Sequence, residues 1–305
     1  MKKLHIILVA LMMTSLGFSQ SHVFSILANK GSNQVKKGTN WNTLSTGSKV
    51  YKGNSIKVVA GGYIGLMHKT GKTIELRTAG EYSVASLEGK LKTSSSSYAE
   101  RYTRFATNMN GSEGAKYKYN ATGSVDRGVG YDLLTQDTIE VIKEIPLTIA
   151  WSVKGKSAND RVELRIVNLF DETLVKSTGK NSSAVLDLTK VTLPGADELI
   201  VANLFDPLSD KGESLIKKAT QVHLVEATKA KKVLAEYNKL VAELDLNSPL
   251  DNMVLASFFA EHGLVSYASS HLYRAASLAP EVTDYEGAFY SYLEKEGVVT
   301  KAQKK

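Results

Sequence analysis

The stretch PLDNMVLASFFAEHGLVSYASSHLYRAASLAP, residues 249–280, decides how the C-terminal part of this chain folds. Apolar residues recur at helical spacing on both sides of Gly263, which predicts one helix over 250–262 and another over 264–278. Pro249 suits the first turn of a helix, and Pro280 ends the second helix. The pattern therefore predicts a pair of helices joined by a glycine turn.

Residues 249–281 resemble a tetratricopeptide repeat. Small residues let the two helices approach closely, while Phe259 and Leu272 fill the space between them. A groove in this family holds a peptide or helix of a partner protein, so the resemblance implies protein–protein contact through an open concave face. The other interpretation is a helical bundle without a ligand. The residues that carry the resemblance are Leu255, Ala256, Phe259, Gly263, Leu264, Ala268, Leu272, Ala275 and Pro280.

Helical periodicity continues on both sides of this pair. Apolar residues mark one face over 226–244, with lysines and glutamates on the rest, and 282–294 has a similar pattern. Residues 226–305 are therefore predicted to form one tetratricopeptide-like helical domain, in which these two helices act as caps for a single repeat.

Residues 138–225 have the period of strands. About seven short alternating segments occur there, and Trp151 lies on an early one, where a core tryptophan would serve. This pattern predicts an immunoglobulin-like β-sandwich, without the cysteine pair of antibody domains.

Short strands separated by glycines also fill residues 20–92, which predicts a compact all-β unit. Two of these strands flank Thr70-Gly71-Lys72 as in a hairpin. The spacing Leu44-x-x-Gly-x-x-Val-x-x-Gly-x-x-Ile56, followed by Thr-Gly-Lys-Thr-Ile-Glu-Leu (70–76) and Gly-Glu-Tyr (80–82), resembles the FecR-type β domain over about residues 22–92. The resemblance implies a FecR-like fold.

The segment 93–137 is predicted to be a connector of one helix and short strands. It mixes basic and aromatic residues, and two interpretations stay open. The segment either offers a contact surface for a glycan or another anionic polymer, or carries a tyrosine stripe that packs a helix onto a sheet. The candidate polymer contacts are Arg101, Tyr102, Arg104, Lys116 and Lys118.

The N-terminus, MKKLHIILVALMMTSLGFSQ (1–20), has the layout of a secretory signal peptide. Two lysines precede an apolar run that is too short for a membrane span, and small residues precede a cleavage site before Gln20. Residues 1–19 are thus expected to be removed, leaving a mature chain without a transmembrane span. The absence of Cys fits export to a bacterial periplasm.

Composition excludes several kinds of chemistry. No Cys occurs among 305 residues, which rules out disulfides, zinc–thiolate sites and cysteine nucleophiles. Six His leave little material for a metal site, and no phosphate-binding loop, nucleophile elbow or metalloprotease motif occurs. The net charge of +7 is too mild to indicate nucleic-acid binding. Neither a cofactor nor a metal is predicted.

The predicted architecture is a multi-domain β plus α chain with a FecR-like unit, an immunoglobulin-like sandwich and a tetratricopeptide-like tail. Three binding-type modules without a catalytic constellation favour a non-enzymatic periplasmic adaptor that binds another cell-envelope protein, peptidoglycan or another anionic polymer. One alternative is a carbohydrate-active or peptidoglycan-modifying enzyme, whose paired carboxylates would come from distant strands. A second alternative is a signalling regulator like the FecR family.

Overall fold

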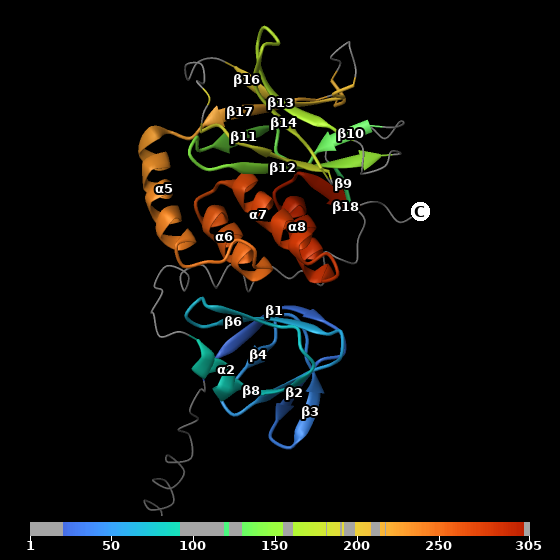
Figure 1. The fold of residues 1–305 in the computed structure, drawn as a ribbon, viewed down its shortest axis with the longest axis vertical. Helices are drawn as coiled ribbons and strands as arrows, with labels where there is room; N and C mark the ends of the chain where they lie inside the picture. The colour runs from blue at the N-terminus through green and yellow to red at the C-terminus, as the bar shows by residue number, and fades with distance from the viewer. Residues whose placement is uncertain are drawn as a thin grey trace, which may run out of the picture.

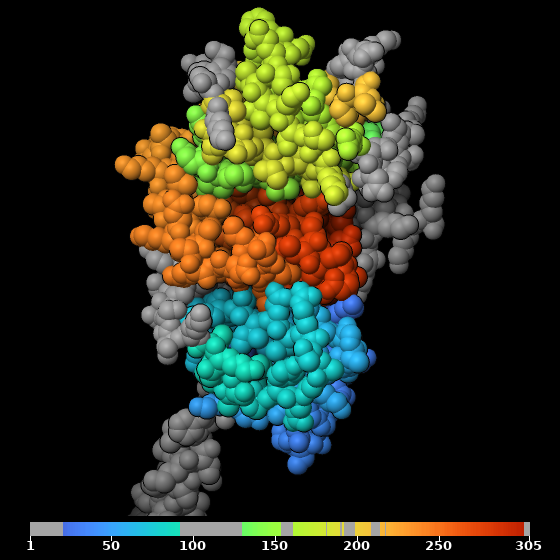
Figure 2. Space-filling view, in the orientation of Figure 1, coloured from blue at the N-terminus to red at the C-terminus, as the bar shows by residue number. Residues whose placement is uncertain are grey.

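The computed structural model describes residues 21–91, 119–121, 130–154, 161–180, 182–189, 191, 199–208, 214–216 and 218–301. These residues form three layers: an N-terminal β unit, a middle layer of helices, and a second β region on the other side of the helices (Figures 1 and 2). The middle layer is the last part of the chain, so the C-terminal helices pack between two β parts that precede them in the sequence. The fold is therefore mixed β plus α, with a β-sheet region followed by a helical C-terminal segment.

The N-terminal β unit, residues 21–91, consists of two antiparallel four-stranded sheets that enclose one apolar core. The strand orders are β4-β1-β6-β7 and β3-β2-β5-β8. The predicted hairpin is confirmed, because Met67 pairs with Thr73 across the turn. The bounds are β1 Phe24–Lys30, β2 Gln34–Lys37, β3 Asn40–Thr43, β4 Lys49–Val50, β5 Ser55–Val58, β6 Tyr63–His68, β7 Thr73–Leu76 and β8 Gly80–Ser83, followed by helix α2, Val84–Lys90.

Strand β6 is buried on both faces of its sheet. Ile64 and Leu66 point into the core of the N-terminal unit, whereas Tyr63 and Met67 belong to the larger core that the helices share. Gly65 lies on the helix side, where a Cβ atom would come within 2.7 Å of a Leu250 side-chain carbon. A larger residue at this position would therefore force the buried Leu250 side chain to shift, and glycine lets strand and helix approach closely.

Polar contacts also join the N-terminal unit to the helices. The hydroxyls of Tyr63 and Tyr285 lie 2.7 Å apart in a buried contact. The Asp284 carboxylate accepts hydrogen bonds from the Asn29 backbone N–H, at 3.0 Å, and from the Thr46 hydroxyl. Each of these polar groups has a hydrogen-bond partner across the contact, so the two layers pack together without unpaired polar atoms at these positions.

The second β region contains a three-stranded sheet, β10-β12-β15, and a five-stranded sheet, β11-β17-β16-β13-β14. Trp151 on β12 is 3% exposed, as predicted for a core residue. Strand β10 falls in the segment predicted as a connector and pairs with β12. The bounds are β10 Gly130–Leu133, β11 Thr138–Val141, β12 Leu147–Lys154, β13 Glu163–Asn168, β14 Thr173–Thr178, β15 Ser183–Leu186, β16 Ile200–Phe205 and β17 Thr220–Leu224, while β9 Tyr119–Ala121 pairs with β18 Val299–Lys301.

The four predicted C-terminal helices are confirmed, each within a few residues of its expected bounds. Ser248 caps the helix that begins at Pro249, because its hydroxyl accepts a hydrogen bond from the Asp251 N–H. Gly263 takes a φ of 72°, the left-handed conformation that ends a helix without steric strain. The bounds are α5 Ala227–Val241, α6 Pro249–Glu261, α7 Val265–Leu278 and α8 Thr283–Lys295.

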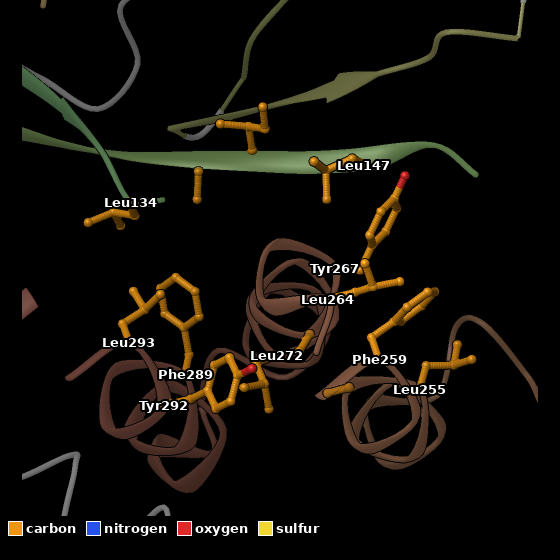
Figure 3. Packing of buried hydrophobic residues seen from close by; sticks show 14 of the residues in the cluster. Leu134, Leu147, Leu255, Phe259, Leu264, Tyr267, Leu272, Phe289, Tyr292 and Leu293 are labelled. Atoms are coloured by element: carbon orange, nitrogen blue, oxygen red, sulfur yellow. The ribbon is translucent and has the colours of Figure 1, made fainter. Parts of the chain in front are cut away.

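The helix pair α6–α7 is closed rather than open, which corrects the prediction of an exposed concave groove on it. Eleven consecutive residues of α6, from Pro249 to Phe259, are buried. Because eleven residues make three full turns, every side of the helix is covered. Figure 3 shows Tyr267 of α7 and Phe289 of α8 directed toward the layer of strand β12, while Tyr292 of α8 points toward Leu272 of α7. The N-terminal unit covers the helices from the other side in Figure 1. No concave face of this pair remains for a partner in the described part of the chain.

Tyr267 locks the helices to the second β region, and we expect Tyr267→Phe to lower the free energy of unfolding by about 2–3 kcal/mol. Its buried hydroxyl lies 3.0 and 2.9 Å from the carbonyl oxygens of Ile142 and Ile145 and accepts a 2.9 Å hydrogen bond from the Ile142 N–H. The variant would remove this partner from the buried Ile142 N–H and Ile145 carbonyl, whereas the Ile142 carbonyl would keep its hydrogen bond from the Ile145 N–H. Urea denaturation measures the change. Tyr82→Phe, which removes one exposed hydrogen bond to Thr78, is the control, and an equal loss in both variants would contradict this role.

Candidate docking site

The residues predicted to grip a partner lie inside the protein. The six apolar members that face the α6–α7 contact are all 0% exposed: Leu255, Ala256, Phe259, Ala268, Leu272 and Ala275. Gly263 and Pro280 lie at the ends of the helices, where they are exposed. The structure brings the predicted set together as a packing motif, and no partner can contact its apolar members without opening the helical layer.

The candidate polymer contacts Arg101, Tyr102, Arg104, Lys116 and Lys118 lie outside the described residues, as does the predicted signal peptide.

The described residues contain no group of three or more His, Asp and Glu placed to hold a metal ion. A polar hollow of about 490 Å³ is lined by residues that include Asp137, Lys218 and Glu296. Asp137 forms an ion pair with Lys218 at 2.5 Å, and both side chains are largely exposed. This arrangement is that of a surface ion pair, in which the carboxylate is already engaged with a cation.

The hairpin between β13 and β14 carries the most conspicuous exposed apolar side chains. Leu169 is 67% exposed and Phe170 is 83% exposed, at the tip of the hairpin that extends beyond the second β region in Figure 1. Burying an aromatic side chain of this size stabilises a complex by about 2 kcal/mol. An exposed aromatic residue at a protruding tip is therefore a candidate anchor for a partner.

Asn168 holds this tip in one conformation. Its Oδ1 accepts hydrogen bonds from the backbone N–H groups of Phe170 and Glu172, at 2.9 and 3.0 Å. Its Nδ2 donates to the Glu172 carboxylate at 2.8 Å. Asp171 supplies the left-handed residue of the turn, with a φ of 59°, and donates its N–H to the Asn168 carbonyl at 3.1 Å. Leu169 and Phe170 thus lie on a loop that hydrogen bonds hold in one conformation, which reduces the conformational entropy lost when a partner binds.

This site is not predicted from the sequence. Leu169 and Phe170 directly follow the alternating segment that predicts a strand, and the pattern assigns no role to them. The available signal was the following Asp171-Glu172, which predicts a turn and would have placed the two apolar residues at its exposed start.

No protein-family model and no curated protein matches this sequence. None of the described helices combines the length and apolar character that a membrane crossing requires.

Proposed function

We propose that this protein is a non-catalytic adaptor of the bacterial periplasm, which docks onto another envelope protein through the tip of the β13–β14 hairpin. The observation that carries this proposal is the exposure of Leu169 and Phe170 on a loop that Asn168 fixes. The location rests on the signal-peptide pattern of residues 1–19. In this proposal a FecR-like unit and an immunoglobulin-like sandwich are joined by a tetratricopeptide-like helix pair, which serves as a rigid spacer.

The charges around the tip favour a protein partner over a lipid surface. Asp171 and Glu172 follow the apolar pair directly and are exposed. Carboxylates next to an apolar tip are repelled by anionic lipid headgroups, whereas a protein pocket with a basic rim accommodates both features. The expected partner therefore offers an apolar pocket of aromatic size beside basic side chains.

Site-specific photo-crosslinking in intact cells tests this docking. A photoreactive amino acid at position 169 is expected to yield one discrete adduct, and Phe170→Asp in the same chain is expected to reduce that adduct at least about tenfold, because a buried charge replaces the anchor. A probe at Leu208, which is 89% exposed, is the matched control and should not yield this adduct. Equal adducts from both positions, or an adduct that persists with Phe170→Asp, would contradict docking through the hairpin.

A further inference from the structure

A second surface lies on the outer face of the sheet β3-β2-β5-β8, in the N-terminal unit. Val35, Ile56 and Val58 of this sheet point into the core. Residues of the opposite parity therefore face outward. The pairs Lys36↔Trp41, Lys36↔Ser55, Gln34↔Thr43 and Gln34↔Lys57 place these six residues together on one outer face.

Trp41 is the large aromatic residue of this face, and the ammoniums of two lysines lie over its ring. The ammonium of Lys36, on the adjacent strand, lies 5.6 Å from the ring centroid, and that of Lys57, one strand further, lies 6.0 Å away. No described carboxylate lies within ion-pair distance of either ammonium, although Glu81 is the cross-strand neighbour of Lys57. Lys57 is exposed, while Trp41 and Lys36 are partly exposed. The face thus combines a flat aromatic surface with two lysines, and the one acidic neighbour that the strand register gives them, Glu81, forms no ion pair with either in the described structure.

The charge of the whole N-terminal unit is strongly one-sided. Residues 21–74 contain eight lysines and no Asp or Glu, and residues 21–91 carry ten basic side chains against three acidic ones. Without Lys2 and Lys3 of the predicted signal peptide the chain carries 36 basic and 31 acidic residues, a net charge of +5, so the +7 of this unit exceeds the charge of the whole remaining chain. A surface of this sign attracts anionic polymers.

We propose that the outer face around Trp41 binds a glycan that bears carboxylate groups. A sugar ring would stack on the indole in place of the lysine ammoniums, and these would turn outward to pair with its carboxylates. The short polar side chains beside them, Gln34, Thr43 and Ser55, supply hydrogen-bonding groups for sugar hydroxyls. This inference deepens the adaptor function by naming a polymer ligand, and it uses the outer β layer opposite the one that carries the β13–β14 hairpin (Figure 1).

Co-sedimentation of the mature full-length chain with purified peptidoglycan sacculi, a glycan whose attached peptides bear carboxylates, tests this site. Wild-type protein is expected to sediment, and Trp41→Ala to weaken binding about tenfold through loss of stacking. The double variant Lys36→Gln/Lys57→Gln should weaken it about fivefold. Intrinsic fluorescence gives a second readout: soluble fragments of the sacculi should change the emission of wild-type protein but not of Trp41→Phe, which retains only the buried Trp151.

The controls distinguish binding at the face around Trp41 from a general electrostatic attraction to the basic N-terminal unit. Lys52→Gln/Lys69→Gln removes the same charge from exposed lysines off this face and should bind as wild type does. Polyglutamate, which is anionic but not a sugar, should not compete with the sacculi. Absence of wild-type binding, equal losses in both double variants, or effective competition by polyglutamate would each overturn the proposal. Phe170→Asp should sediment normally, so failure of the hairpin docking and failure of this site are distinguishable.

Discussion

Phe259→Ala is expected to lower the free energy of unfolding by about 3–5 kcal/mol, because the ring is 0% exposed and its removal leaves a cavity. The ring is stacked at 4.8 Å on Tyr267 and at 5.3 Å on His271, and it meets Phe258 edge-on at 4.9 Å. Such aromatic pairs add to the effect of apolar burial alone. Truncating Phe259 therefore removes contacts between α6 and α7 that no neighbouring side chain can replace without a shift.

Phe170→Ala is the matched control, since it makes the same chemical change at a side chain that is 83% exposed. We expect that variant to stay within about 0.5 kcal/mol of the wild-type stability. Urea denaturation of both variants, followed by circular dichroism, gives the comparison. A loss under about 1 kcal/mol for Phe259→Ala would mean that the α6–α7 contact opens readily, as a ligand-holding groove would.

The sequence predicted the helices well and their surroundings poorly. The spacing of apolar residues is a local signal, as are the residues that begin or end a helix, Pro249, Gly263 and Pro280. These signals predicted the bounds of α6 and α7 to within a few residues. What covers a helix depends on distant segments, so the tetratricopeptide-like spacing could not exclude a β layer on each side. One local signal did point to full burial. Helix α6 is apolar around most of its circumference, and a helix of that kind is buried on all sides.

Polar residues of α6 are buried as well as apolar ones. Asn252 is 0% exposed, yet its amide nitrogen donates hydrogen bonds to the carbonyls of Leu246 and Ser248, at 2.9 and 2.8 Å. On sequence alone such a residue marks a solvent-facing side of a helix. Its partners come from the turn before α6, and the satisfaction of a buried amide becomes visible only in three dimensions.

The two proposed docking surfaces could not be predicted from the sequence for a different reason. Leu169-Phe170 and Trp41 are single apolar residues or pairs inside strand-like patterns, which sequence reading assigns to a core by default. Their exposure follows from the turn at Asp171 and from the strand register that puts Trp41 beside Lys36. Helix α2, Val84–Lys90, was likewise not predicted, because its one clear signal is the Ser83 hydroxyl that caps its first turn.

His271 is expected to make the protein less stable as the pH falls below about 6.5. Burial, together with the nearby charge of Arg274, lowers the pKa of this histidine to about 3. Both Asn252 amide hydrogens are used on carbonyls, so its Oδ1 must accept the proton of His271 Nδ1, 3.0 Å away. This arrangement fits a neutral imidazole. The folded state therefore resists protonation, while the unfolded chain takes up a proton near pH 6.5.

Between pH 6.5 and about 3 the unfolded state binds more protons than the folded state. Lowering the pH in this range therefore decreases the free energy of unfolding, by about 1.4 kcal/mol per pH unit. His271→Asn keeps a donor near the position of Nδ1 and removes the titrating ring. It should be less stable at pH 7 because it loses the contact with Phe259, but its stability should fall less steeply in acid. His223→Gln, at an exposed histidine, is the control.

Urea denaturation of the three proteins between pH 7 and pH 4 measures these slopes, and only the difference between slopes is attributed to His271. Asp251 acts in the opposite direction, because burial raises its pKa and its protonation stabilises the folded state as the pH falls. That contribution is common to all three proteins and cancels in the comparison. Parallel curves for wild type and His271→Asn would show that the imidazole gains a proton without opening the helical layer. A shallower curve for His271→Asn alone would identify the sealed α6–α7 contact as the part of the fold that acid disrupts.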